Sequence, residues 1–139
     1  MEDDIEIRNI FRDSKVIAVV GLSRNPAKTS RSVTSYMMSK GYHIVPINPL
    51  ADSLMGEDAY PSLADLPPDV AEIIDIVDIF RPSEALPPIV EAAVNNLPSL
   101  RVIWAQLGIR SEEAAKVAER AGVPMIQDRC IRVEYGRLM

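Results

Sequence analysis

Short apolar runs alternate with amphipathic stretches along this chain. Residues 16–20 are all apolar, as in a strand that helices cover on both faces, whereas a half-exposed strand would alternate apolar and polar residues. The same criterion predicts further strands over residues 42–47, 73–80, 101–106 and 123–126. Because amphipathic segments separate these runs, the pattern predicts βαβ units and a mainly parallel, five-stranded sheet.

The segments between the runs predict helices on both faces of this sheet. We expect helices over residues 3–13, from Thr29 or Ser30 as N-cap to about residue 40, from residues 83–86 to about 95, and over 111–121. A single turn is expected at 63–66, a stop at 67–69, and a short helix or extended arm over 131–139. The fold class is therefore α/β, doubly wound, and residues 1–139 form a single domain.

The charge and the cysteine content narrow the classes of function. A net charge of −5 argues against a general nucleic-acid-binding surface, which usually needs a basic excess. The single cysteine excludes an internal disulfide and fits a reducing, cytoplasmic setting. No apolar stretch approaches the ~20 residues that cross a bilayer, and the acidic N-terminus lacks a signal-peptide core. We therefore expect a small-molecule ligand, with neither nucleic acid nor membrane as partner.

The loop after the first strand has the composition of an anion site. Gly21 ends the apolar run, and the residues that follow are small, polar or basic, among them Ser23, Arg24 and Lys28. The next helix directs its free N–H groups and the positive end of its dipole toward this loop, which favours phosphate. The dinucleotide fingerprint G-x-G-x-x-G is absent, because Ser23 and Pro26 stand at its second and third glycine positions. Gly21 taken alone is equally well a simple turn residue.

The end of the second strand argues against NAD as the ligand. An NAD site has a carboxylate there, which binds the ribose hydroxyls. This chain instead has Asn48-Pro49, and the nearest acid, Asp52, comes several residues later. The ribose signature of NAD is therefore missing.

Two acidic residues interrupt the apolar run of the third predicted strand. They are Asp75 and Asp78, which an extended strand points to opposite faces. Since a buried charge is costly without a partner, we expect both to lie near a strand end or edge or to face polar groups.

Taken in order, the motifs resemble those of one protein family. Nearly the whole chain is covered by the stretches VVGLSRNPAKTSRSV, GYHIVPINP, YPSLADLP, VDIFRPSEALPPIVEAAV, VIWAQLGIRSEEAAKVAERAG and DRCIRVEYGRL. As a set they are similar to the small CoA-binding proteins related to the nucleotide-binding domain of the succinyl-CoA synthetase alpha subunit. The resemblance implies a Rossmann-like domain that binds coenzyme A through its ADP moiety. The site residues that it implies are Gly21, Ser23, Arg24, Lys28, Ser30, Asn48, Pro49, Phe80 and Arg81.

Cys130 is a further candidate contact for this cofactor. It lies just beyond the fifth predicted strand, on the side of the sheet where the ligand is expected. It is either a small buried residue or a thiol near the pantetheine end of CoA, able to form a mixed disulfide with it.

We therefore expect a protein that binds CoA or an acyl-CoA at the carboxyl ends of the strands, without catalysis of its own. No Ser/His/Asp set, metal-ligand cluster or carboxylate pair is visible, and the one histidine, His43, lies inside the second strand. Two alternatives stay open. One is an enzyme that uses NADP or another adenine nucleotide, with Arg24 meeting a 2′-phosphate. The other is a regulatory interaction module that keeps the fold without the ligand.

Overall fold

The computed structural model describes residues 4–139 and confirms the predicted sheet. Its strands are β1 (Val16–Val20), β2 (His43–Ile47), β5 (Ile76–Ile79), β6 (Val102–Ala105) and β7 (Met125–Ile126). They pair in the order β2-β1-β5-β6-β7, and every pair is parallel. β1 is buried along its whole length, as its unbroken apolar run predicts.

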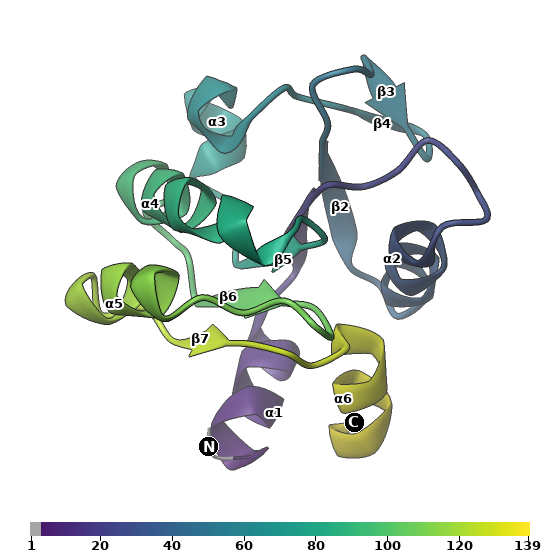
Figure 1. Ribbon diagram of the computed structural model, residues 1–139. Coiled ribbons are helices and arrows are strands. Elements are labelled where there is room, and N and C mark those ends of the chain that lie inside the picture. The colour runs from purple at the N-terminus through teal and green to yellow at the C-terminus, as the bar shows by residue number, and fades with distance from the viewer. Residues whose placement is uncertain (1–3) are drawn as a thin grey trace.

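Helices cover both faces of the sheet, which confirms the doubly wound, Rossmann-like α/β fold. Figure 1 shows α1 (Asp4–Asp13), α2 (Thr29–Ser39) and α6 (Ile131–Leu138) on one face, with α4 (Leu86–Asn96) and α5 (Glu112–Arg120) on the other. The faces bury separate apolar clusters, because successive side chains of a strand point to opposite sides. Ile17 and Trp104 belong to the cluster under α1, α2 and α6, whereas Ala18 and Ile103 belong to the cluster under α4 and α5.

The segment between β2 and β5 carries more structure than the sequence predicts. β3 (Ser53–Leu54) and β4 (Glu57–Asp58) form a small antiparallel hairpin, whose turn places Met55 at φ 53° and Gly56 at φ 83°. Methionine rarely adopts a left-handed conformation, so the sequence contains no clear signal for this turn. The 3₁₀ turn η1 (Leu63–Asp65) lies at the expected single turn.

A short helix, α3 (Pro68–Ala71), begins where a stop was expected. That prediction is wrong because proline fits the first turn of a helix, where its missing N–H would have no partner in any case. The same property explains the next helix, α4, which starts at Leu86 after the 3₁₀ turn η2 (Ser83–Ala85) and has its prolines in the first turn.

The predicted cap of α5 is confirmed, since the Ser111 hydroxyl accepts the Ala114 N–H at 3.1 Å. The C-terminal tail forms the helix α6 rather than an extended arm. The start predicted for the first helix, residue 3, lies outside the described residues.

Asp75 and Asp78 have different surroundings. Asp75 lies just before β5, where its Oδ2 accepts the N–H groups of Lys15 at 2.8 Å and Val16 at 3.1 Å, and its Oδ1 faces Arg101 Nε at 3.2 Å. This confirms the expected strand-end position. Asp78 also lies near a strand end, as the third of the four residues of β5, but it is 1% exposed, and its Oδ1 has no hydrogen-bond partner among residues 4–139. Burial raises the pKa of Asp78 well above its usual range.

Candidate ligand-binding site

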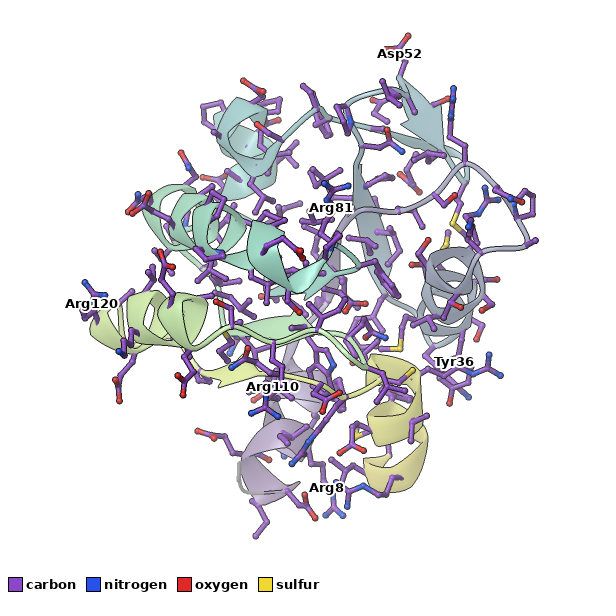
Figure 2. The ribbon with its side chains drawn as sticks, viewed as in Figure 1. Arg8, Tyr36, Asp52, Arg81, Arg110 and Arg120 are labelled. Atoms are coloured by element: carbon purple, nitrogen blue, oxygen red, sulfur yellow. The ribbon has the colours of Figure 1, made fainter. Side chains whose placement is uncertain are left out.

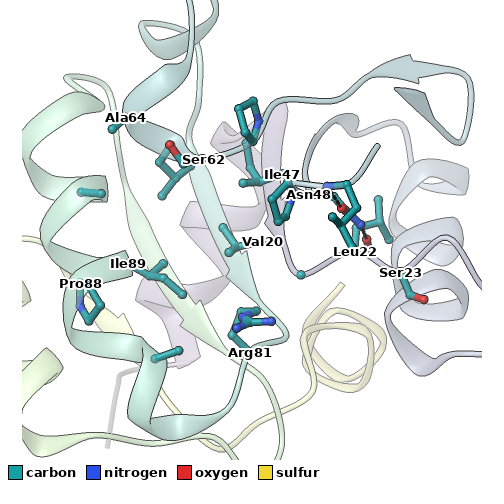
Figure 3. Close-up of a pocket in the computed structure, with 17 residues that line it drawn as sticks. Val20, Leu22, Ser23, Ile47, Asn48, Ser62, Ala64, Arg81, Pro88 and Ile89 are labelled. Atoms are coloured by element: carbon teal, nitrogen blue, oxygen red, sulfur yellow. Dashed lines mark hydrogen bonds between the residues drawn. The ribbon is translucent and has the colours of Figure 1, made fainter. Parts of the chain in front are cut away.

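A pocket of about 550 Å³ opens at the carboxyl ends of β1 and β2, beside η1 and the first turns of α4 (Figure 3). Ligands of doubly wound sheets bind at this edge, where the strand order reverses. The strand ends contribute Val20, Gly21, Leu22, Ser23, Ile47, Asn48, Pro49, Leu50 and Arg81 to its lining. Most of the lining is apolar, and Arg81 is the one charged side chain among the lining residues, all of which belong to the described chain.

Gly21 brings three strand ends together beside this pocket. Its N–H donates to the carbonyl oxygen of Ile47, the last residue of β2, at 3.2 Å. Gly21 has a φ of +88°, and a Cβ at this position would lie 2.8 Å from the carbonyl oxygen of Phe80, at the end of β5. Both the left-handed conformation and the close approach require glycine. Gly21 is therefore a turn residue and also a contact between β1 and β5.

The loop after Gly21 is held by its own polar groups. The Ser23 N–H donates to the Ser30 hydroxyl at 3.0 Å, and the Asn25 N–H donates to the Ser23 hydroxyl at 3.0 Å. The Ser30 side chain thus fastens the loop to α2 and does not cap the helix. The predicted cap is wrong for Thr29 too, because Lys28 occupies the N-cap position and no side chain caps the helix.

Asn48 connects this loop to the end of β2. Its Nδ2 donates to the Leu22 carbonyl at 2.9 Å, and its Oδ1 accepts the Leu50 N–H at 2.7 Å. Both ends of the amide are therefore used to shape the pocket.

The same loop presents unpaired donors and cations. The backbone N–H groups of Arg24, Thr29 and Ser30 donate to no acceptor within the described residues. The side chains of Arg24 and Lys28 are exposed and form no ion pair with any part of the chain from residue 4 onward. Because the N-terminus of the 11-residue helix α2 adds the positive end of its dipole, the loop is suited to bind a phosphate group.

The structure brings most of the predicted site residues to one edge of the sheet. Those that line the pocket are Gly21, Ser23, Asn48, Pro49 and Arg81. Those that lie next to it, on the loop, the first turn of α2 and the end of β5, are Arg24, Lys28, Ser30 and Phe80. Cys130 does not join them, because it is the N-cap residue of α6 and packs half-buried against the cluster under α1, α2 and α6.

Sequence reasoning missed one wall of the pocket and one arginine. This η1–α4 wall is formed by η1 with the two residues before it, the end of η2, and α4, and it consists of Pro61, Ser62, Leu63, Ala64, Ala85, Pro88, Ile89 and Ala92. Figure 3 shows Ser62 and Ala64 at the opposite end of the pocket from Arg81 in this view. Ile89 and Ala92 are three residues apart in a predicted helix, and this spacing was the available signal that the two share a face. The arginine is Arg31, in the first turn of α2, whose Nη1 donates to the Arg24 carbonyl at 3.0 Å.

Two kinds of feature are absent from residues 4–139. No helix in this range is long and apolar enough to cross a membrane. Across the same residues, no group of at least three His, Cys, Asp or Glu side chains is arranged to hold a metal ion. The exposed His43 begins β2, at the end of the strand remote from the pocket.

Comparison with known proteins identifies the family. The chain is 41% identical over 130 residues to the uncharacterized protein YneT of Bacillus subtilis, a match that covers 94% of this chain and 92% of YneT. It superposes on the structure of a Thermus thermophilus protein, cell-free ID.343, with a TM-score of 0.89 and 36% identity, over 99% of this chain and 100% of that one.

A larger relative shares only part of its length with this chain. An ADP-forming acetate–CoA ligase (II) of Archaeoglobus fulgidus is 26% identical over 118 residues, which is 83% of this chain but 17% of the ligase. The model of the family described as the CoA binding domain matches residues 15–136. The chain therefore belongs to the CoA-binding domain family.

Proposed function

We propose that this protein binds CoA or an acyl-CoA through its ADP moiety, at the carboxyl ends of β1, β2 and β5, without catalysing a reaction of its own. One observation carries the proposal: an apolar pocket with a single cation, Arg81, opens directly beside a loop with free N–H groups and unpaired basic side chains. An adenosine with phosphates attached needs this combination of an apolar slot and adjacent donors. Membership of the family points to the same ligand.

Each part of the ligand has a suitable surface. The adenine ring would lie between the apolar residues of β1, β2 and the η1–α4 wall, among them Val20, Ile47 and Ile89. The pyrophosphate would accept hydrogen bonds from the free N–H groups at the start of α2. The flexible side chains of Arg24 and Lys28 would balance its negative charge. Arg81, at the edge of the pocket, would contact the 3′-phosphate or the pyrophosphate through charge-assisted hydrogen bonds.

The groups that a dehydrogenase or a hydrolase would need are not among the pocket residues of the described chain. Among residues 4–139, no carboxylate, histidine or cysteine lines the pocket. The Asn48 amide, at the position where NAD-binding proteins carry an acid, is hydrogen-bonded to the Leu22 carbonyl and the Leu50 N–H. A binding protein fits this lining better than an enzyme.

Two predictions from the sequence remain untested. One is that Cys130 contacts the pantetheine thiol of CoA, and the other is a cytoplasmic location.

Isothermal titration calorimetry with CoA, acetyl-CoA, dephospho-CoA, NAD and NADP tests the proposal. We expect CoA to bind at least about tenfold more tightly than NAD, a difference of about 1.4 kcal/mol. The reason is that Arg81 in the lining and the cations of the adjacent loop suit phosphates, whereas the described lining residues include no acid for a ribose diol. Tighter binding of NADP than of CoA would favour the nucleotide-dependent enzyme, and no binding of any of the five would favour a module without ligand.

The loop cations give a second prediction. The Arg24→Ala and Lys28→Ala variants should each bind CoA more weakly by about 1–3 kcal/mol, because each loses one charge-assisted contact to a phosphate. Both side chains are exposed, so the free energy of unfolding should change little. The matched control is Arg120→Ala, which removes one cation from the outer end of α5, away from Arg81 (Figure 2). Unchanged CoA affinity in both loop variants would place the phosphates elsewhere.

A further inference from the structure

Arg31 makes an unusual set of contacts for a basic side chain. It lies in the first turn of α2, and its Nη1 donates to the carbonyl oxygens of Arg24 at 3.0 Å and Ser23 at 3.5 Å. Its Nε is buried without a hydrogen-bond partner, and it forms no ion pair with any residue from 4 to 139. The guanidinium of Arg31 is therefore bound by the backbone of the loop after Gly21 and not by a carboxylate.

The geometry of the peptide bond turns this contact into a constraint on the loop. All described peptide bonds are trans, so the C=O of Ser23 and the N–H of Arg24 point in opposite directions from the same planar group. With the Ser23 carbonyl directed to the guanidinium, the Arg24 N–H must be directed away from it. This N–H has no acceptor in the described chain.

The next peptide is held in the same way. The Arg24 carbonyl also accepts from Arg31, and the following N–H, that of Asn25, donates to the Ser23 hydroxyl at 3.0 Å. Of the two peptides that Arg31 orients, the second is thus satisfied within the loop, and the first leaves one donor free beside the pocket-lining Ser23.

We infer that Arg31 is a positioning residue, which fixes the Ser23–Arg24 backbone so that the free N–H of Arg24 donates to the pyrophosphate of the ligand. The inference rests on the proposed function and adds a specific role to it. An arginine suits this task because both N–H groups of Nη1, which donate to the two carbonyl oxygens, are fixed in the rigid plane of the guanidinium, whereas a lysine ammonium is a point charge on a flexible stem.

Ligand affinities of the Arg31→Ala and Arg31→Lys variants test the inference. We expect Arg31→Ala to weaken CoA, dephospho-CoA and ADP by the same factor, about tenfold, and to leave the affinity for adenosine unchanged, because only the pyrophosphate uses the Arg24 N–H. Arg31→Lys keeps the charge and loses the rigid planar group, so it should recover less than half of the lost binding free energy. The Arg120→Ala variant again controls for the loss of one cation.

Other outcomes would overturn the inference. A loss confined to CoA, with dephospho-CoA unaffected, would mean that Arg31 contacts the 3′-phosphate directly. Full recovery by Arg31→Lys would mean that only its charge matters, and an equal loss for adenosine would mean that it merely supports the fold.

A second measurement follows the Arg24 amide itself. In ¹H–¹⁵N spectra, CoA should shift the Arg24 resonance of the unchanged protein by a clear margin, and the shift should be absent in Arg31→Ala at saturating CoA. An equal shift in both proteins would contradict the inference. If the unchanged protein binds no CoA at all, the proposed function fails, whereas CoA binding that Arg31→Ala leaves unaltered contradicts only the role of Arg31.

Discussion

The Gly21→Ala variant is expected to lose about 2–4 kcal/mol of folding free energy and to bind CoA at least about tenfold more weakly than the unchanged protein. The left-handed φ of +88° alone costs an alanine about 1–2 kcal/mol. The remainder comes from the new Cβ, which would lie 2.8 Å from the Phe80 carbonyl oxygen and 3.1 Å from Arg81 Cδ. Since both neighbours belong to the edge of the pocket, relief of this contact must move Arg81.

A substitution at a second glycine separates the effect of the backbone conformation from the effect of the Cβ contact. Gly41 also has a positive φ, +99°, but nothing lies within 4 Å of the position of its Cβ, and it follows α2 at the end remote from the pocket. Gly41→Ala should therefore cost only about 1–2 kcal/mol and leave CoA affinity unchanged. Urea unfolding and calorimetry on the two variants measure these quantities. If Gly21→Ala bound CoA as tightly as Gly41→Ala, the pocket would not depend on the packing of Gly21 against β5.

The sheet could be predicted from the sequence because its strands are buried on both faces. An unbroken apolar run such as residues 16–20 has few alternatives to a central parallel strand, and all five runs occupy the sheet. The end of each run then places Gly21, Asn48 and Arg81 at one edge without any knowledge of side-chain contacts.

The site could be predicted only as far as it depends on strand ends. The η1–α4 wall depends on the packing of a turn against a helix that is distant in sequence, and neither Ser62 nor Pro88 carries a pattern that indicates a pocket. Arg31 was missed because its partners are backbone carbonyls, which are the same for every residue type. The position of Cys130 after β7 predicted that it lies on the ligand side, but as the N-cap residue of α6 it packs against the cluster under α1, α2 and α6.

Asp78 is the least expected feature of the core, because its side chain is 1% exposed and its Oδ1 has no hydrogen-bond partner among residues 4–139. It lies between Val19 and Trp104 in the register of the sheet, on the face covered by α1, α2 and α6. Burial without a hydrogen bond to Oδ1 penalises the carboxylate and raises its pKa well above the ordinary value of 3.8. Asp78 is therefore a source of pH-dependent instability in the centre of the fold.

The Asp78→Asn variant should gain stability relative to the unchanged protein as the pH rises. Below pH 3.8 the carboxyl group is protonated in both the folded and the unfolded chain. Above that pH the unfolded chain releases its proton first, so the free energy of unfolding falls by up to about 1.4 kcal/mol per pH unit until the folded pKa is passed. The asparagine side chain does not titrate, so the variant does not lose unfolding free energy in this way as the pH rises.

Urea unfolding of both proteins at pH 5, 6, 7 and 8 measures the difference, which should increase with pH in favour of Asp78→Asn. A difference that stays constant across this range would show that Asp78 has an ordinary pKa in the folded protein. Asp75→Asn is the matched control, because this substitution should lower the free energy of unfolding instead of raising it. Its carboxylate accepts the N–H groups of Lys15 and Val16 and faces Arg101, so removing the charge should cost about 1–3 kcal/mol at pH 7.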